Sequence, residues 1–308
     1  MEALIYKSTG SWYTAKANDG KFYQARAKGI FKIDGISSTN PIAVGDKVIL
    51  EKEEGQEDTT IITEILPRYN YIARQSPANK HQHHIVAANL HQSFLVVTIK
   101  DPKTSQGFID RFLVSSEAFH VPAYIIFNKK DIYKEKDLIK YELLKQVYES
   151  IGYPVFLVSA DTNEGIEELH ELMKDKVTLF SGHSGVGKSS LINKLIPGLT
   201  LRTKQVSGWS GKGLHTTTFA EMFDLPYGGS LIDTPGVREF GVIDIEKREL
   251  SHYFPEMRAL IHNCQFNNCI HINEPGCAVL EALENSEIDV ERYVSYLRIM
   301  DTIEEKNY

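Results

Sequence analysis

The first 68 residues alternate short β-favouring runs with turn signals. Asn18-Asp19-Gly20 is a strong hairpin signal, because Asn and Gly tolerate positive φ. Several short strands at close spacing favour a small β-barrel, which we expect to end near Pro67. The expected strands cover residues 4–7, 11–17, 22–28 and 44–51.

From about residue 90 the pattern changes to buried strands that alternate with amphipathic helices. The expected strands cover residues 94–99, 121–127, 155–158, 178–180 and 230–232. The expected helices cover residues 108–119, 136–151 and 165–173. This alternation predicts a parallel sheet with helices on both faces. We therefore assign residues 1–68 to a barrel domain and residues 69–240 to an α/β domain.

After residue 240 the pattern changes again. A cysteine-rich loop precedes an amphipathic helix, whose apolar face we expect to carry Val290, Tyr293, Val294 and Leu297. Residues 241–308 thus form a third, mainly helical domain. The predicted fold class is a multidomain α/β protein with a barrel at one end of the chain and a small helical domain at the other.

The amino-acid composition limits the classes of partner that the protein is expected to bind. The net charge of -7 and the pI of about 5.9 count against a broadly basic nucleic-acid-binding surface, so any RNA contact must come from local patches. The chain contains no apolar run of the ~20 residues that a bilayer-spanning helix needs. Residues 1–7 lack a basic region followed by an apolar stretch, so we expect no signal peptide, no membrane and a cytoplasmic protein.

The strongest chemical signal is a G-x-x-x-x-G-K-[ST] sequence directly after an expected strand and at the start of a helix. Its glycines let backbone N–H groups converge on phosphate oxygens, and the helix N-terminus adds its dipole. Lys188 would reach the β- and γ-phosphates, and the Ser189 hydroxyl would bind Mg²⁺. The alternative is a chance glycine-rich turn. The expected phosphate-binding residues are Gly182, His183, Ser184, Gly185, Val186, Gly187, Lys188, Ser189 and Ser190.

Two further motifs indicate which base is bound. Asn128-Lys129-Lys130-Asp131 follows one buried strand and matches N-K-x-D, in which a carboxylate accepts from guanine N1–H and the 2-amino group together. Ser159-Ala160 follows the next strand and matches an S-A-x motif that closes a base pocket. Each is weak alone, but the pair at adjacent strand ends predicts guanine selectivity.

The remaining GTPase signals lie after the glycine-rich turn. Asp233-Thr234-Pro235-Gly236 fits D-x-x-G, in which we expect Asp233 to hold Mg²⁺ through water and the Gly236 N–H to sense the γ-phosphate. The alternative is an ordinary Pro-Gly turn. Thr217, with Thr216 as the fallback, is the expected switch threonine that completes the Mg²⁺ shell. The predicted magnesium set is therefore Ser189, Thr217 and Asp233.

The order of these motifs is rotated. In Ras-like GTPases the N-K-x-D and S-A-x motifs come last, whereas here they come first. The rotation places D-x-x-G just ahead of the C-terminal domain, so we hypothesise that movement of this loop pulls on the region after residue 240.

A second constellation predicts a metal site. The three cysteines of the chain, Cys264, Cys269 and Cys277, lie with His271 in one short window. Cys₃His is a structural zinc set with no open position for substrate, so we expect one bound Zn²⁺ in a structural role. Three buried free cysteines are the alternative, and His262 is a less favoured ligand. A run containing His81, His83 and His84 is expected to be a surface loop rather than a metal tract.

The rotated motif order, the preceding barrel and the Cys-x4-Cys-x-His-x5-Cys tail resemble the ribosome small-subunit-dependent GTPase A family of circularly permuted bacterial GTPases. The resemblance covers nearly the whole chain. It implies an N-terminal OB-fold, a central GTPase domain and a C-terminal zinc domain. It also implies late maturation of the small ribosomal subunit, contact with its rRNA, and GTP hydrolysis stimulated by that subunit.

An OB-fold would offer aromatic side chains to RNA bases. Trp12, Tyr13, Phe22 and Tyr23 are stacking candidates, although at least half of them are expected to lie in the barrel core. Nearby basic residues outnumber the acids, which partly offsets the negative total charge. We expect the protein to act as a monomer that binds GTP and GDP.

The water-orienting residue is less clear. The position after the D-x-x-G glycine is Val237, which cannot hydrogen-bond, so we predict slow intrinsic hydrolysis. His215, beside the switch threonines, is the candidate for orienting water, with a packing or capping role as the equal alternative. Two other functions stay open: a nucleotide-gated RNA-binding module with negligible turnover, and a P-loop ATPase of another class.

Overall fold

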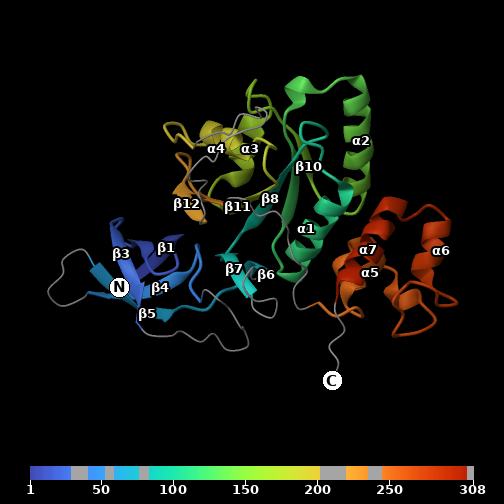
Figure 1. Cartoon of the computed structure of the whole chain (residues 1–308), viewed down its shortest axis with the longest axis horizontal. Coiled ribbons are helices and arrows are strands. Elements are labelled where there is room, and N and C mark those ends of the chain that lie inside the picture. Colours follow the sequence, from blue (N-terminus) through green and yellow to red (C-terminus); the bar gives the residue numbers. More distant parts are fainter. Residues whose placement is uncertain (29–40, 53–58, 76–82, 202–219, 235–244, 304–308) are drawn as a thin grey trace, which may run out of the picture.

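Three regions follow one another along the molecule: a β-barrel, a central sheet covered by helices and a small helical domain (Figure 1). The structure is a computed structural model. It describes residues 1–28, 41–52, 59–75, 83–201, 220–234 and 245–303. This sequence of regions confirms the predicted multidomain α/β class.

The barrel closes because its first strand pairs with both the second and the fourth, which gives the cyclic order β1-β2-β3-β5-β4. Alternate side chains point inward, and Ile5, Ala15 and Val48 are buried among them. Such a five-stranded barrel is the predicted OB-type fold, although β5 was not foreseen. The strands are β1 (Glu2–Ser8), β2 (Tyr13–Ala17), β3 (Phe22–Ala27), β4 (Lys47–Lys52) and β5 (Thr59–Ile65).

The central sheet runs in the order β10-β9-β8-β11-β13-β12. Its first five strands are parallel and β12 is antiparallel. The expected strands and helices are all present, and β12 is an addition. The strands are β8 (Gln92–Val97), β9 (Ala123–Phe127), β10 (Val155–Leu157), β11 (Val177–Ser181), β12 (Glu221–Asp224) and β13 (Ser230–Asp233).

Helices cover both faces of this sheet, as predicted. One core cluster joins the sheet to α1 (Gln106–Ala118) and α2 (Glu135–Ser150). The other joins it to α3 (Ile166–Met173) and α4 (Lys188–Leu195). The carboxyl ends of the parallel strands are thereby left for the loops that carry the GTPase motifs.

The barrel and the central sheet are continuous. Lys7 of β1 pairs with Glu221 of β12, so the two sheets merge into one 11-stranded sheet in the described chain. A hairpin of β6 (Tyr71–Gln75) and β7 (His83–Ala88) lies beside this junction. The predicted surface loop at His83 and His84 is therefore wrong, because both residues lie in β7, while His81 falls outside the described residues.

The C-terminal domain is built from short helices that pack around a core of its own against α1. In α7 the buried face carries Tyr293, Tyr296 and Ile299, whereas Val290 is 59% exposed. Val290 was thus wrongly assigned to the apolar face. The helices are η2 (Leu250–Tyr253), α5 (Pro255–Arg258), η3 (Ile261–Asn263), α6 (Ala278–Glu284) and α7 (Val290–Thr302). Among the described residues, no helix has the length and apolarity that crossing a bilayer requires.

Candidate nucleotide pocket and metal centre

The glycine-rich turn connects the end of β11 to the start of α4, as the sequence predicted. Gly182, Gly185 and Gly187 all have positive φ, at 150°, 89° and 88°. A Cβ on Gly187 would lie 2.3 Å from Asn128 Nδ2, so only glycine fits there. The loop therefore has the curled backbone and the helix N-terminus that phosphate binding needs.

The side chain of Asn128 joins three of the predicted motifs. Its Nδ2 donates at 2.9 Å to the carbonyl oxygen of Val186 in the glycine-rich loop of residues 182–189, called the P-loop below. Its Oδ1 accepts from the N–H of Ala160 in the S-A-x motif at 3.1 Å. Asn128 is itself buried. One buried amide thus fixes the phosphate loop, the N-K-x-D loop and the S-A-x loop relative to one another.

The base-facing loops meet at Asp131. The Ser159 hydroxyl donates to Asp131 Oδ1 at 2.5 Å and accepts from the N–H of Thr162 at 3.1 Å. Asp131 is exposed, so its carboxylate is accessible from solvent. The ammonium of Lys130 pairs with the carboxylate of Glu164, so this side chain connects the N-K-x-D loop to the loop after β10.

Lys129 adopts a left-handed backbone conformation with φ of 69°. Its ammonium donates to the carbonyl oxygen of Asp101, in the loop after β8. Burial lowers the pKa of Lys129, and the nearby Asp101 and Asp131 carboxylates oppose that shift. The aliphatic stem of Lys129 is thereby held between the N-K-x-D loop and the loop after β8.

The phosphate end of the pocket combines a cation with hard oxygen donors. Lys188 Nζ lies 2.7 Å from Asp233 Oδ1 and 2.6 Å from the carbonyl oxygen of Thr234. Phe180 of β11 pairs directly with Asp233 of β13, which explains why the two motifs converge. A lysine for phosphate and a carboxylate beside the hydroxyl-bearing first turn of α4 have the chemistry of a magnesium–nucleotide site.

Several predicted residues lie outside the described residues: His215, Thr216, Thr217, Gly236 and Val237. The switch threonine, the γ-phosphate sensor and the water-orienting residue therefore stay predictions.

The loop between β8 and α1 contacts the glycine-rich loop, and sequence reasoning missed this contact. The Thr104 hydroxyl lies 2.7 Å from His183 Nε2, and Pro102 packs against the P-loop so that a Cβ on Gly185 would approach it to 3.3 Å. Neither Pro102 nor Thr104 belongs to a motif. Their position directly after a buried parallel strand was the only signal, because such loops gather at one sheet edge.

The predicted metal ligands converge in the C-terminal domain. The ligand atoms of Cys264, Cys269, His271 and Cys277 all lie within 4.8 Å of one another. His271 Nδ1 is 3.7 Å from the sulfur of Cys264 and 3.4 Å from that of Cys277. Tetrahedral Zn–S and Zn–N bonds would separate such atoms by about 3.5–3.8 Å, so the four residues can hold a metal ion. His262 is exposed and outside this group.

The surrounding chain shapes the metal group. Gly276 has φ of 67° just before Cys277, and a Cβ there would come within 2.6 Å of Gln265 Oε1. The Tyr293 hydroxyl donates to the carbonyl oxygen of His271 at 2.7 Å, which ties the ligand loop to α7. The metal group is therefore part of the core of this domain rather than an appended loop.

Comparison with known families agrees with this arrangement. Residues 65–243 match the family model described as RsgA GTPase, and residues 2–61 match the model of the RsgA N-terminal domain. The first of these covers more than half of the chain.

Individual relatives resemble the chain over its full length. Small ribosomal subunit biogenesis GTPase RsgA of Bacteroides fragilis is 51% identical over 309 residues, with 100% of this chain and 99% of that protein covered. The protein of the same name from Flavobacterium psychrophilum is 51% identical, covering 98% and 93%. The crystal structure of YjeQ from Thermotoga maritima superposes with a TM-score of 0.77 at 35% identity and covers 97% of both chains. YloQ, a circularly permuted GTPase, has a TM-score of 0.73 at 28% identity, covering 100% and 96%.

Proposed function

The chain belongs to the RsgA family of circularly permuted GTPases and is a GTP hydrolase, and we propose that it acts in late maturation of the small ribosomal subunit, which stimulates its GTP hydrolysis. The observation that carries the site assignment is the double hydrogen bond of Asn128, which assembles three nucleotide-binding motifs in rotated order. The names of the relatives support the ribosomal role.

In the proposed complex, Asp131 accepts two hydrogen bonds from the guanine edge, and the stem of Lys129 covers the base plane. The loop from Gly182 to Ser190 surrounds the phosphates, and Lys188 neutralises charge between the β- and γ-phosphates. Ser159 and Ala160 close the base pocket. The 2.5 Å bond from Ser159 to Asp131 supports this role, because it orients the carboxylate, whose remaining lone pairs can accept from the two guanine donors.

Ser189, Thr217 and Asp233 hold Mg²⁺ together with the nucleotide in our proposal. Magnesium supplies charge stabilisation for the leaving and transferring phosphate oxygens. Gly236 senses the γ-phosphate through its N–H, and His215 orients the attacking water. Because Val237 cannot orient water, intrinsic turnover is slow, and the small subunit accelerates it.

Each of the three domains has a separate proposed role. Residues 1–68 contact rRNA, residues 69–240 bind and hydrolyse GTP, and residues 241–308 form a structural domain around one Zn²⁺. Cys₃His is a closed zinc set, which supports a structural rather than a catalytic metal. The protein works as a monomer in the cytoplasm, where small subunits mature.

The proposed RNA-contacting face of the barrel contains fewer aromatic side chains than the sequence indicated. Phe22 is 55% exposed and Trp12 is 45% exposed, which supports stacking on unpaired bases. Tyr13 is 3% exposed and belongs to the barrel core, and Tyr23 is partly buried against it. The proposal therefore keeps Trp12 and Phe22 and drops Tyr13.

Phosphate release tests the proposed function. We expect purified small subunits to raise the rate of GTP hydrolysis by at least about tenfold, whereas large subunits do not. Lys188→Ala should abolish the stimulated rate, because it removes the cation that we assign to the β- and γ-phosphates. Equal rates with and without small subunits would instead favour a nucleotide-gated RNA-binding module. Competition between GTP and ATP tests the remaining alternative, because a P-loop ATPase would prefer ATP.

A further inference from the structure

A short chain of contacts leads from the P-loop into the first turn of α1. The Thr104 hydroxyl lies 2.7 Å from His183 Nε2, and the ring of Phe108 meets that of His183 edge-on with centroids 5.3 Å apart. The Thr104 hydroxyl also accepts from the N–H of Thr98 at 3.1 Å, which leaves its proton for His183. Any displacement of His183 in the P-loop therefore acts directly on the start of α1.

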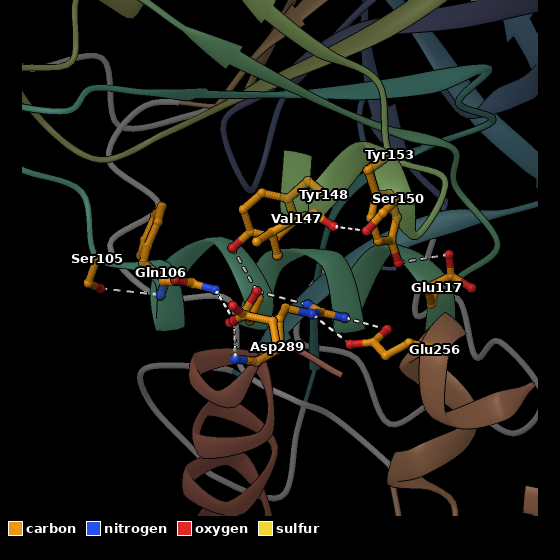
Figure 2. Close-up of polar contacts among 12 residues, drawn as sticks. Ser105, Gln106, Glu117, Val147, Tyr148, Ser150, Tyr153, Glu256 and Asp289 are labelled. Atoms are coloured by element: carbon orange, nitrogen blue, oxygen red, sulfur yellow. Dashed lines mark hydrogen bonds and ion pairs between the residues drawn. The ribbon is translucent and has the colours of Figure 1, made fainter. Parts of the chain in front are cut away.

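The opposite side of the same turn contacts the C-terminal domain. Gln106 Nε2 donates to Asp289 Oδ1 at 3.0 Å, and Figure 2 shows the two side chains pointing toward one another. Asp289 is the N-cap of α7, where its carboxylate also accepts from the N–H of Arg292 at 3.0 Å. Residues 104–108 thus contact both His183 in the P-loop and Asp289 at the N-cap of α7.

The next turn of α1 prevents the two helices from moving independently. Asp110 is fully buried and accepts from Arg292 of α7 and from the Tyr148 hydroxyl of α2, each at 2.8 Å. Arg292 also binds Glu256 through two nitrogens, at 2.8 and 2.9 Å. Separating α1 from α7 would take the guanidinium of Arg292 away from the fully buried Asp110 carboxylate, which is costly, so a shift of α1 carries α7 with it.

We propose that Thr104 and Gln106 are positioning residues that couple the P-loop to the C-terminal domain through α1. Nucleotide in the P-loop fixes the position of His183. The hydrogen bond between His183 and Thr104 then fixes the start of α1, and the hydrogen bond between Gln106 and Asp289 fixes the N-cap of α7. The coupling is reciprocal, so the contact between Gln106 and Asp289 also stabilises the nucleotide-binding arrangement of His183. This route is separate from the chain connection through residues 235–244, and it rests on the proposed function only in that nucleotide occupies the P-loop.

Amide hydrogen exchange in α7, measured on the full chain with and without GDP, tests the coupling. We expect GDP to slow exchange in α7 of the wild-type protein by about twofold to tenfold, the range of one net hydrogen bond. Thr104→Val keeps the shape of the side chain but removes the hydroxyl, and at saturating GDP it should abolish the slowing of exchange in α7. Because the coupling is reciprocal, it should also weaken GDP binding by about twofold to tenfold. Gln106→Ala should weaken GDP binding by about twofold to tenfold.

Glu117→Gln is the matched control, because it weakens a contact between the far end of α1 and Arg258 of the same C-terminal domain. It should leave both the α7 response and the GDP affinity unchanged. An α7 response that persists in Thr104→Val would contradict the proposal and favour the route through residues 235–244. A wild-type protein that binds GDP without any change in α7 would overturn the coupling but not the GTPase assignment, whereas failure to bind GDP would overturn both.

Discussion

Asn128 hydrogen-bonds through its side-chain amide to the P-loop carbonyl of Val186 at 2.9 Å. The same amide accepts from Ala160, so its loss would leave two buried backbone groups without partners. Each such group costs about 1–3 kcal/mol, and part of that cost falls on the nucleotide-binding arrangement. We therefore expect Asn128→Ala to weaken GDP binding by at least about tenfold, measured by titration with a fluorescent GDP analogue.

Asn70 offers a matched control for this substitution. Its side chain makes the same kind of double bond, to the N–H and C=O of Leu90 at 2.7 and 2.8 Å. Leu90 precedes β8, at the end of the sheet opposite the nucleotide loops. Asn70→Ala should lower thermal stability but keep GDP affinity. Equal losses of affinity in both variants would show that Asn128 acts only through stability.

The base preference should change when Asp131 becomes an amide. A carboxylate accepts from the two donors of guanine, whereas an amide offers one acceptor and one donor. Xanthine presents a donor at N1 and a carbonyl at C2, which matches the amide. We expect Asp131→Asn to lose GDP affinity by about a hundredfold or more, since an unmatched buried hydrogen-bonding edge is strongly rejected, and to gain affinity for XDP. Competition between the two diphosphates gives the measurement. Unchanged preference would place the base elsewhere.

The candidate nucleotide site could be proposed from the sequence because its motifs are local in the chain. The loop around Lys188 needs glycines at fixed spacing, Asp131 lies just after β9, and Asp233 is the last residue of β13. Strand and helix periodicity then fixes where those loops lie, since the ends of parallel strands meet at one edge. The metal ligands were predictable for the same reason, because Cys264 and Cys277 lie within one short window.

Contacts between distant segments gave no such signal. Arg292 and Asp110 are 182 residues apart, and neither belongs to a motif, yet they form a buried ion pair. The pairing of Lys7 with Glu221 merges two sheets, but β12 is too short to show a period. Val290 was placed on the wrong face because a buried arginine, Arg292, occupies the core side of α7. Pattern rules assign charged residues to solvent, and here tertiary pairing overrides them.

Loss of the metal should unfold the C-terminal domain rather than impair nucleotide binding alone. Cys277 is buried at the start of α6, and Tyr293 ties the ligand loop to α7. Structural zinc contributes on the order of 10 kcal/mol to folding in isolated zinc-finger peptides at neutral pH. We expect Cys277→Ser to lose one equivalent of zinc, measured by elemental analysis, and to lose the cooperative unfolding of this domain. His262→Ala should retain both, because His262 lies outside the ligand group. Retention of zinc by Cys277→Ser would contradict the assignment.

Binding to the small subunit should depend on the two exposed barrel aromatics. Base–aromatic stacking contributes about 1–3 kcal/mol per base, so Trp12→Ala and Phe22→Ala should each weaken cosedimentation with small subunits by about fivefold or more. Ile139→Ala removes a side chain of similar exposure, at 58%, on α2 and serves as the control. If the α2 variant binds as weakly as the barrel variants, the barrel face is not the RNA contact.

The buried Arg292 pair gives a prediction about stability. Its guanidinium is 1% exposed, bonds Asp110 and Glu256, and lies 4.7 Å from the ring centroid of Phe254. Removing one partner of a buried pair costs about 3–5 kcal/mol, because the remaining charge has lost its compensation. Arg292→Met should therefore lower the free energy of unfolding by about that amount. Urea denaturation followed by circular dichroism gives the measurement.

Two comparisons separate this electrostatic cost from a simple loss of packing. Arg258→Met in the same domain breaks a pair with Glu117 whose side chains are 49% and 25% exposed, and such pairs contribute about 0–1 kcal/mol. The triple replacement of Arg292, Asp110 and Glu256 by Met, Leu and Met removes all three charges together, and it should recover most of the stability lost in Arg292→Met. A triple variant no more stable than Arg292→Met would mean that the arginine stabilises the domain interface through shape and stacking on Phe254 rather than by neutralising the two carboxylates.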